Sequence, residues 1–277
     1  MSSFETRLFE DSHGSFDKEA LLGIEAVLDE MGEQQGKDFV SLMNEHNIDL
    51  GKIKFDPNTL ILNRVMYLEE YQLVDLTMFA PLAGVKVGVG GMPPMSEMLL
   101  RMIEQCKRVS DKLRTMKEKG HYEEFFSMID KKFLAQELYD VVMDGDAPEK
   151  ELSTGFMRGY IRMESGFEIF DEEFMEVLHS RIVDCPERAS RIKNIEDKVE
   201  NGYLKILQGS KTDAVEFSSW TTDESIAEFF ANRFDGNGFV IEGKVHVEDI
   251  IDYYPARGES EVIALEDNVE VLSIRET

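Results

Sequence analysis

The chain has 277 residues and a formal net charge of −26 at pH 7. Its hydrophobic fraction of 42% and charged fraction of 31% exclude a disordered protein and predict a globular one, large enough for one domain or two small ones. So negative a chain repels phosphate backbones, which argues against nucleic acid as a partner. Its charge favours a basic target protein, although solubility alone also explains the acidity.

The composition also bears on location and on metal binding. No stretch approaches the ~18 apolar residues that a membrane-spanning helix needs, and residues 1–7 lack the basic and apolar segments of a secretory signal. We therefore expect a cytoplasmic protein, in the producing or the infected cell, with no membrane partner. Cys106 and Cys185 are expected to be free thiols, and the scattered histidines predict no metal site.

The first third of the sequence reads as helical. Apolar residues at helical spacing predict a helix over 21–31 and a short one over 39–43, and a third helix is expected over 60–79. The glycine- and proline-rich stretch 83–94 ends this pattern, and without a Gly-Lys-Ser/Thr motif it favours a linker or hairpin over a phosphate loop. Residues 1–92 are thus expected to form an N-terminal helical region of unknown function.

Two long amphipathic helices are predicted next, from Ser96 to Gly120 and from Tyr122 to Met143. After Pro148 the sequence changes to short segments rich in β-branched and aromatic residues. The predicted strands are 156–162, 215–220, 238–247, 260–265 and 269–274, and the predicted helices between them are 171–183 and 223–233, the latter with a capping box from Thr221 to Glu224. This irregular order of elements predicts an α+β fold.

Three motifs in this half carry the candidate chemistry: Arg158-Gly159, Ser219-Trp220-Thr221 and Glu259-Ser260-Glu261. Residues two apart on a strand project from one face, so the carboxylates of Glu259 and Glu261 are expected side by side. Singly, each motif has a simpler explanation, such as an ion pair for the arginine, a turn for the serine or a solvated edge for the glutamates. Their order along the chain favours a common site.

In that order, the motifs resemble the Arg/Ser/Glu class of mono-ADP-ribosyltransferases, which includes the actin-modifying binary-toxin enzymes and transferases of T4-like phages. The resemblance covers residues 152–274 and implies a mixed β-sandwich transferase core within a catalytic domain over 93–277. It further implies NAD⁺ as a substrate, an arginine of a target protein as acceptor, no metal, and a phage- or toxin-type effector.

The resemblance also assigns roles to residues. It implies NAD⁺ contacts at Arg158, Gly159, Ser219, Thr221, Phe230 and Arg233, with the arginines on the phosphates and Phe230 on the nicotinamide ring. Glu261, oriented by Ser219, would stabilise the charge that develops on the ribose. Glu259 would select arginine, because a carboxylate pairs with guanidinium and accepts its proton. Tyr253 and Tyr254 would lie in the turn that recognises the target.

Two features depart from the family pattern. The interval between Arg158 and Ser219 is long, which leaves room for an extra helix or loop, and the tyrosines lie farther from Glu259 than the family places them. The alternatives are an NAD⁺ glycohydrolase, a nucleic-acid ADP-ribosyltransferase, and a non-catalytic protein-binding module on a decayed transferase fold. A serine hydrolase is not supported, because the sequence contains no Gly-x-Ser-x-Gly motif.

Overall fold

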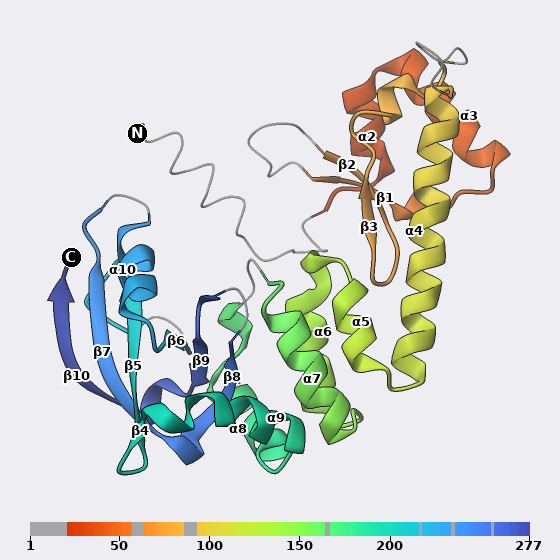
Figure 1. Cartoon of the computed structure of the whole chain (residues 1–277). Coiled ribbons are helices and arrows are strands. Elements are labelled where there is room, and N and C mark those ends of the chain that lie inside the picture. The colour runs from red at the N-terminus through yellow and green to blue at the C-terminus, as the bar shows by residue number, and fades with distance from the viewer. Residues whose placement is uncertain are drawn as a thin grey trace. The chain divides into compact units, whose positions relative to one another are not determined.

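The computed structural model describes residues 21–56, 64–85, 93–163, 167–215, 218–233, 236–255 and 258–277. The chain folds into two compact units (Figure 1), one formed by residues 1–137 and 159–167 and the other by residues 138–158 and 168–277. Within the described ranges, no helix combines the length and apolar character needed to cross a membrane. All strand pairs described below are antiparallel, which confirms the α+β class.

The first unit begins with a small sheet beside two helices. The helices are α2 (Ile24–Met31) and α3 (Glu33–Glu45), as predicted, and the three strands are β1 (Ile53–Asp56), β2 (Arg64–Leu68) and β3 (Leu73–Asp75). The helix predicted over 60–79 is therefore wrong where β2 and β3 lie. Residues 57–63 lie outside the described part. The β-branched and aromatic residues there pair across a hairpin, so this region is not purely helical.

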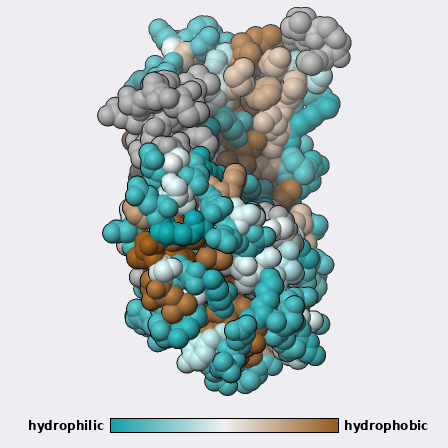
Figure 2. Space-filling model, turned by 60° about the vertical axis from the view of Figure 1, so that its left-hand side comes forward, coloured by the Kyte–Doolittle hydropathy of each residue, from teal (hydrophilic) through white to brown (hydrophobic). Residues whose placement is uncertain are grey.

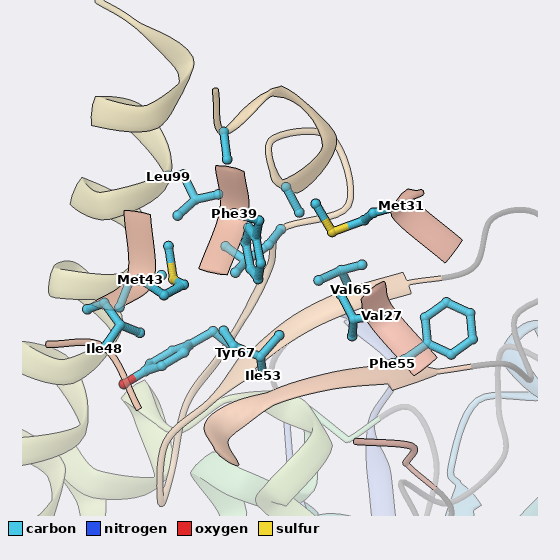
Figure 3. Packing of buried hydrophobic residues seen from close by; sticks show 14 of the residues in the cluster. Val27, Met31, Phe39, Met43, Ile48, Ile53, Phe55, Val65, Tyr67 and Leu99 are labelled. Carbon is cyan, nitrogen blue, oxygen red and sulfur yellow. The ribbon is translucent and has the colours of Figure 1, made fainter. Parts of the chain in front are cut away.

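Helix α4 (Met95–Glu118) shares a hydrophobic core with the elements before it. Phe39 from α3 and Tyr67 from β2 are fully buried in this cluster together with Leu99 from α4 (Figure 3). The core therefore extends past residue 92, and the predicted domain boundary there does not coincide with the division between the two units. Gly120, with φ 72°, follows the helix, in agreement with the predicted stop.

The middle of the chain departs from the prediction at two places. The helix expected over 122–143 is two helices, α5 (Tyr122–Met128) and α6 (Lys131–Asp144). The strand expected over 156–162 is wrong, because residues 149–160 form helix α7 (Glu149–Tyr160). Leu152 and Phe156, one helical turn apart, are both fully buried, so the apolar pattern of this segment has the helical period rather than the alternation of a strand.

The second unit contains a seven-stranded sheet with the order β10-β7-β5-β6-β9-β8, with β4 also paired to β5 (Figure 1). The strands are β4 (Val199–Glu200), β5 (Tyr203–Ser210), β6 (Ser219–Thr221), β7 (Phe239–His246), β8 (Ile250–Tyr254), β9 (Glu261–Ala264) and β10 (Val269–Glu276). The helices are α8 (Glu172–Ile182), α9 (Pro186–Ile192) and α10 (Glu224–Asn232). The predicted strands from 238 onward and both predicted helices are confirmed. Strands β4, β5 and β8 and helix α9 were not predicted.

Both faces of the sheet carry buried residues. On one face, Ile206, Trp220 and Val262 join a core cluster with Ile195, which follows α9 in the 3-10 helix η4 (Lys193–Lys198). On the other face, α10 packs against β5 and β7 around Leu207. A Cβ on Gly209 of β5 would lie 2.1 Å from the Ala227 carbonyl oxygen of α10, so the helix backbone rests directly on the strand.

The surface view agrees with the acidic composition. Figure 2 shows one face of the molecule, on which hydrophilic residues are widespread and hydrophobic residues gather in a few patches. Of the second unit's side chains, Phe229 on α10 is 60% exposed, and Val271, Leu272 and Ile274 on the edge strand β10 are between 44% and 47% exposed.

Candidate functional site

The pairing of β6 with β9 brings Ser219 and Glu261 together. Ser219 lies opposite Ile263, and Thr221 lies opposite Glu261, so Ser219 and Glu261 are diagonal neighbours on one face of the sheet. The Ser219 Oγ donates a hydrogen bond to Glu261 Oε1 at 2.6 Å, and both residues are partly buried. This contact matches the expectation that the serine hydroxyl orients the glutamate.

Glu259 is held beside this pair by its backbone. Thr221 Oγ1 donates to the Glu259 carbonyl oxygen at 2.6 Å, and the Thr222 amide donates to the Ser260 carbonyl oxygen at 3.3 Å. Ser260 has φ 47°, and β9 begins only at Glu261. The expectation of two carboxylates on one regular strand is therefore wrong, because a left-handed residue separates Glu259 from Glu261.

Thr221 has a structural role in this arrangement. It is 6% exposed, and its hydroxyl, besides donating to Glu259, accepts a hydrogen bond from the Asp223 amide at 3.1 Å. Both hydrogen bonds fix the turn after β6, so the predicted NAD⁺ contact at Thr221 is not supported. Asp223 caps α10 in place of the predicted Thr221, and the hydrogen bonds it accepts from Ser225 lower the pKa of its carboxyl.

Phe230 and Arg233 lie together at the end of α10. The Arg233 guanidinium carbon is 5.9 Å from the centre of the Phe230 ring, and Arg233 is exposed. A Cβ on Gly209 would come within 2.9 Å of Phe230 Cβ, so this pair stands directly over β5. The two predicted contacts from α10 thus lie on the face of the sheet that also carries Ser219 and Glu261, where Leu207 of β5 pairs with Thr221.

Arg158 and Gly159 do not lie where they were predicted. Both belong to helix α7, where Arg158 is exposed and Gly159 is buried in the last turn. Neither is on a strand, because residues 149–160 follow the helical period. The predicted roles of this pair, in holding the NAD⁺ phosphates and approaching the nicotinamide, depended on a strand over 156–162, and that strand is wrong.

Strand β5, which the sequence did not predict, lies next to β6 in the sheet. Leu207 pairs with Thr221; the next residue, Gln208, is 5% exposed and donates from Nε2 to the Ser219 carbonyl oxygen at 2.9 Å. Gln208 thus ties β5 to the residue whose hydroxyl contacts Glu261. The sequence does contain a weak signal for β5, because Leu204 and Ile206 alternate with a lysine within the long interval between Arg158 and Ser219.

The two predicted target-recognition tyrosines differ in their surroundings. Tyr253 is 4% exposed and belongs to the core opposite Val262, so its ring is not available to a partner and the prediction is wrong for it. Tyr254 is partly exposed and lies opposite Glu261 on the neighbouring strand. It therefore shares a face with the Ser219–Glu261 pair.

A buried ion pair between Arg191 and Asp252 holds β8, the strand that carries both tyrosines. Asp252 is fully buried, and Arg191 of α9 donates from Nε to its Oδ1 at 2.8 Å and from Nη2 to the Ser153 Oγ of α7 at 2.6 Å. Burial raises the pKa of the Asp252 carboxyl, and the Arg191 guanidinium opposes that shift. The contacts join α7, α9 and β8, and thereby hold the strand that pairs with Glu261.

In the described ranges, no cluster of three or more His, Cys, Asp or Glu residues could hold a metal ion. Cys106 and Cys185 are both free, as predicted, and both are buried. The sequence matches no family model and no curated protein, and no solved structure matches the chain.

Proposed function

We propose that this protein transfers ADP-ribose from NAD⁺ to an arginine of a target protein and releases nicotinamide. The observation that carries the proposal is the hydrogen bond of 2.6 Å from Ser219 Oγ to Glu261 Oε1, across two paired strands. A carboxylate oriented in this way can stabilise positive charge without reorganising during the reaction. Glu259, whose backbone carbonyl oxygen accepts a hydrogen bond from Thr221 of β6, is the second acid of the proposal.

The proposed reaction uses both acids. The bond between nicotinamide and the ribose C1′ breaks, its electron pair leaves with nicotinamide, and Glu261 stabilises the positive charge on the ribose. A guanidinium nitrogen of the acceptor then bonds to C1′, and Glu259 accepts the proton that this nitrogen loses. The products are nicotinamide and ADP-ribosylated arginine.

The surrounding residues suit a dinucleotide and a basic target. Arg233 offers an exposed cation for the NAD⁺ phosphates beside the Phe230 ring, which offers an apolar face for nicotinamide. Tyr254, opposite Glu261, is the remaining candidate for contact with the target. The net charge of −26 steers a basic, arginine-bearing protein towards this chain.

A second candidate is a protein-binding module on a transferase fold that no longer transfers. The observation that favours it is the position of Arg158, because the arginine that the resemblance assigns to the NAD⁺ phosphates lies on helix α7 and not on a strand. The two candidates differ in a simple property, since only the first consumes NAD⁺.

The deciding experiment follows the label from NAD⁺ carrying a radioactive adenylate, in the presence of a cell lysate. We expect label in protein, removable by hydroxylamine as an arginine linkage is, and loss of labelling in Glu261→Gln. Glu200→Gln changes an exposed strand glutamate outside the site and is the matched control. Label recovered as free ADP-ribose would indicate a glycohydrolase, label in nucleic acid a different acceptor, and intact NAD⁺ the binding module.

A further inference from the structure

A side-chain hydrogen bond of Gln208 connects β5 to β6 where the backbone pairing of the two strands stops. Strand β6 is three residues long and pairs with β9 at three residue pairs, but with β5 only at Leu207 and Thr221. Ser219 lies beyond that single pair. Its carbonyl oxygen accepts a hydrogen bond from the Gln208 side chain at 2.9 Å, where a continued ladder would have used backbone.

We propose that Gln208 is a positioning residue: its side-chain amide holds the Ser219 backbone so that the Ser219 hydroxyl reaches Glu261. Two hydrogen bonds connect the three residues in series, at 2.9 Å from Gln208 to Ser219 and at 2.6 Å from Ser219 to Glu261. The kinetic part of this inference rests on the proposed function. The structural part, the tie between β5 and β6, does not.

The surroundings of Gln208 make the tie rigid. Gln208 is 5% exposed, so its amide has little access to water as a substitute partner, and loss of the donor leaves the Ser219 carbonyl oxygen with one partner fewer. The next residue, Gly209, lies directly under the α10 backbone, and all of β5 is paired with β7. Gln208 is therefore anchored on a part of the sheet that cannot easily follow a movement of β6.

Trp220 can report a movement of β6, the strand in which it lies. Trp220 is the only tryptophan of the sequence, lies between Ser219 and Thr221, and is 2% exposed. Its fluorescence emission depends on the polarity around the indole, so a shift of β6 changes the emission whether or not the protein turns over NAD⁺. Amide hydrogen exchange of residues 218–222 gives a second reading of the same movement.

The test compares Gln208→Met, which keeps the length of the side chain and removes the donor, with Gln72→Met. Gln72 makes the same kind of bond, from Nε2 to the Met128 carbonyl oxygen at 3.0 Å, in the first unit. We expect Gln208→Met to red-shift the Trp220 emission, to speed exchange at residues 218–222, and to lower kcat roughly tenfold with little change in KM for NAD⁺. The control variant should change none of these.

The outcomes separate the inference from the proposed function. Wild-type protein that leaves NAD⁺ intact contradicts the function, while the emission and exchange of Gln208→Met still test the tie. Unchanged emission and exchange in Gln208→Met overturn the inference, as does unchanged kcat in an active protein. Should Gln208→Met fail to fold, Gln208→Glu replaces it. Only its protonated form carries a donor, so its emission should approach that of the wild type as pH falls, and a constant difference between pH 5 and pH 8 would contradict the inference.

Discussion

Replacement of Gly209 by alanine tests how closely α10 rests on the sheet. The added Cβ would lie 2.1 Å from the Ala227 carbonyl oxygen, 2.6 Å from the Ala231 amide nitrogen and 2.9 Å from Phe230 Cβ. Because the two nearest atoms are backbone, no side-chain rotation relieves the clash. Helix α10 must rise by roughly 1 Å, and Phe230 and Arg233 must rise with it.

The loss of stability in Gly209→Ala can be compared with that in Gly243→Ala, which changes a second strand glycine of the same unit. A Cβ on Gly243 would meet Val269 Cγ1 at 2.6 Å, and its nearest backbone atom is at 3.3 Å, so a side chain can absorb most of the strain. Overpacking costs about 1–3 kcal/mol in general. We therefore expect Gly209→Ala to lower the free energy of unfolding by about 3 kcal/mol and Gly243→Ala by about 1 kcal/mol.

Urea unfolding followed by Trp220 emission measures both variants in the unit that contains them. In active protein, Gly209→Ala should also raise KM for NAD⁺, because it displaces the proposed contacts on α10. Equal stability of the two variants, within about 0.5 kcal/mol, would refute the close approach of helix and strand.

Three further predictions concern Glu259, the ion pair of Arg191 with Asp252, and the Cys106 thiol. Glu259→Gln should slow arginine modification more than NAD⁺ hydrolysis, and equal loss of both rates, measured with labelled NAD⁺, would contradict the acceptor role. Arg191→Met should destabilise the second unit by about 3–5 kcal/mol in urea, because it removes the guanidinium that hydrogen-bonds to the fully buried Asp252. The double variant with Asp252→Leu should recover most of that loss, and failure to recover would show that the guanidinium acts by packing. Burial raises the pKa of the Cys106 thiol to about 12, so Cys106 stays neutral in folded protein at pH 8. Iodoacetamide should label it there only after unfolding, as peptide mass spectrometry can check; and because the unfolded thiol ionises first, this group's contribution to stability is lost as pH rises from about 9 towards 12.

Local patterns predicted the second half of the sheet well. Strands β7, β9 and β10 were recognisable from β-branched residues between turns, and α10 from its apolar spacing. The contact between Ser219 and Glu261 followed from the resemblance, since no local rule brings residues so far apart in sequence together. The sequence could not reveal that Ser260 is left-handed between the two glutamates, because the hydrogen bonds on either side of it come from Thr221 and Thr222, which are far from it in sequence.

The largest difference between prediction and structure lies at Arg158, and it has a physical cause. The aromatic and β-branched residues of 156–162 predict a strand, but Leu152 and Phe156 already set a helical period that the segment continues. Strand β5 was overlooked because it contains lysine, glutamine and glycine, which are weak strand formers. Its stability comes from pairing with β7 along its whole length, which is a tertiary effect.

The most direct test of the account measures nicotinamide release from NAD⁺ by the wild-type protein, Glu261→Gln and the control Glu200→Gln. Glu261→Gln removes the charge that is proposed to stabilise the ribose, and one preorganised group of this kind is worth about 10² to 10³ in rate. We expect release by the wild type and by the control, and a loss of that size in Glu261→Gln. Equal release by all three proteins, or none by the wild type, would contradict the central claim that the Ser219–Glu261 pair splits NAD⁺.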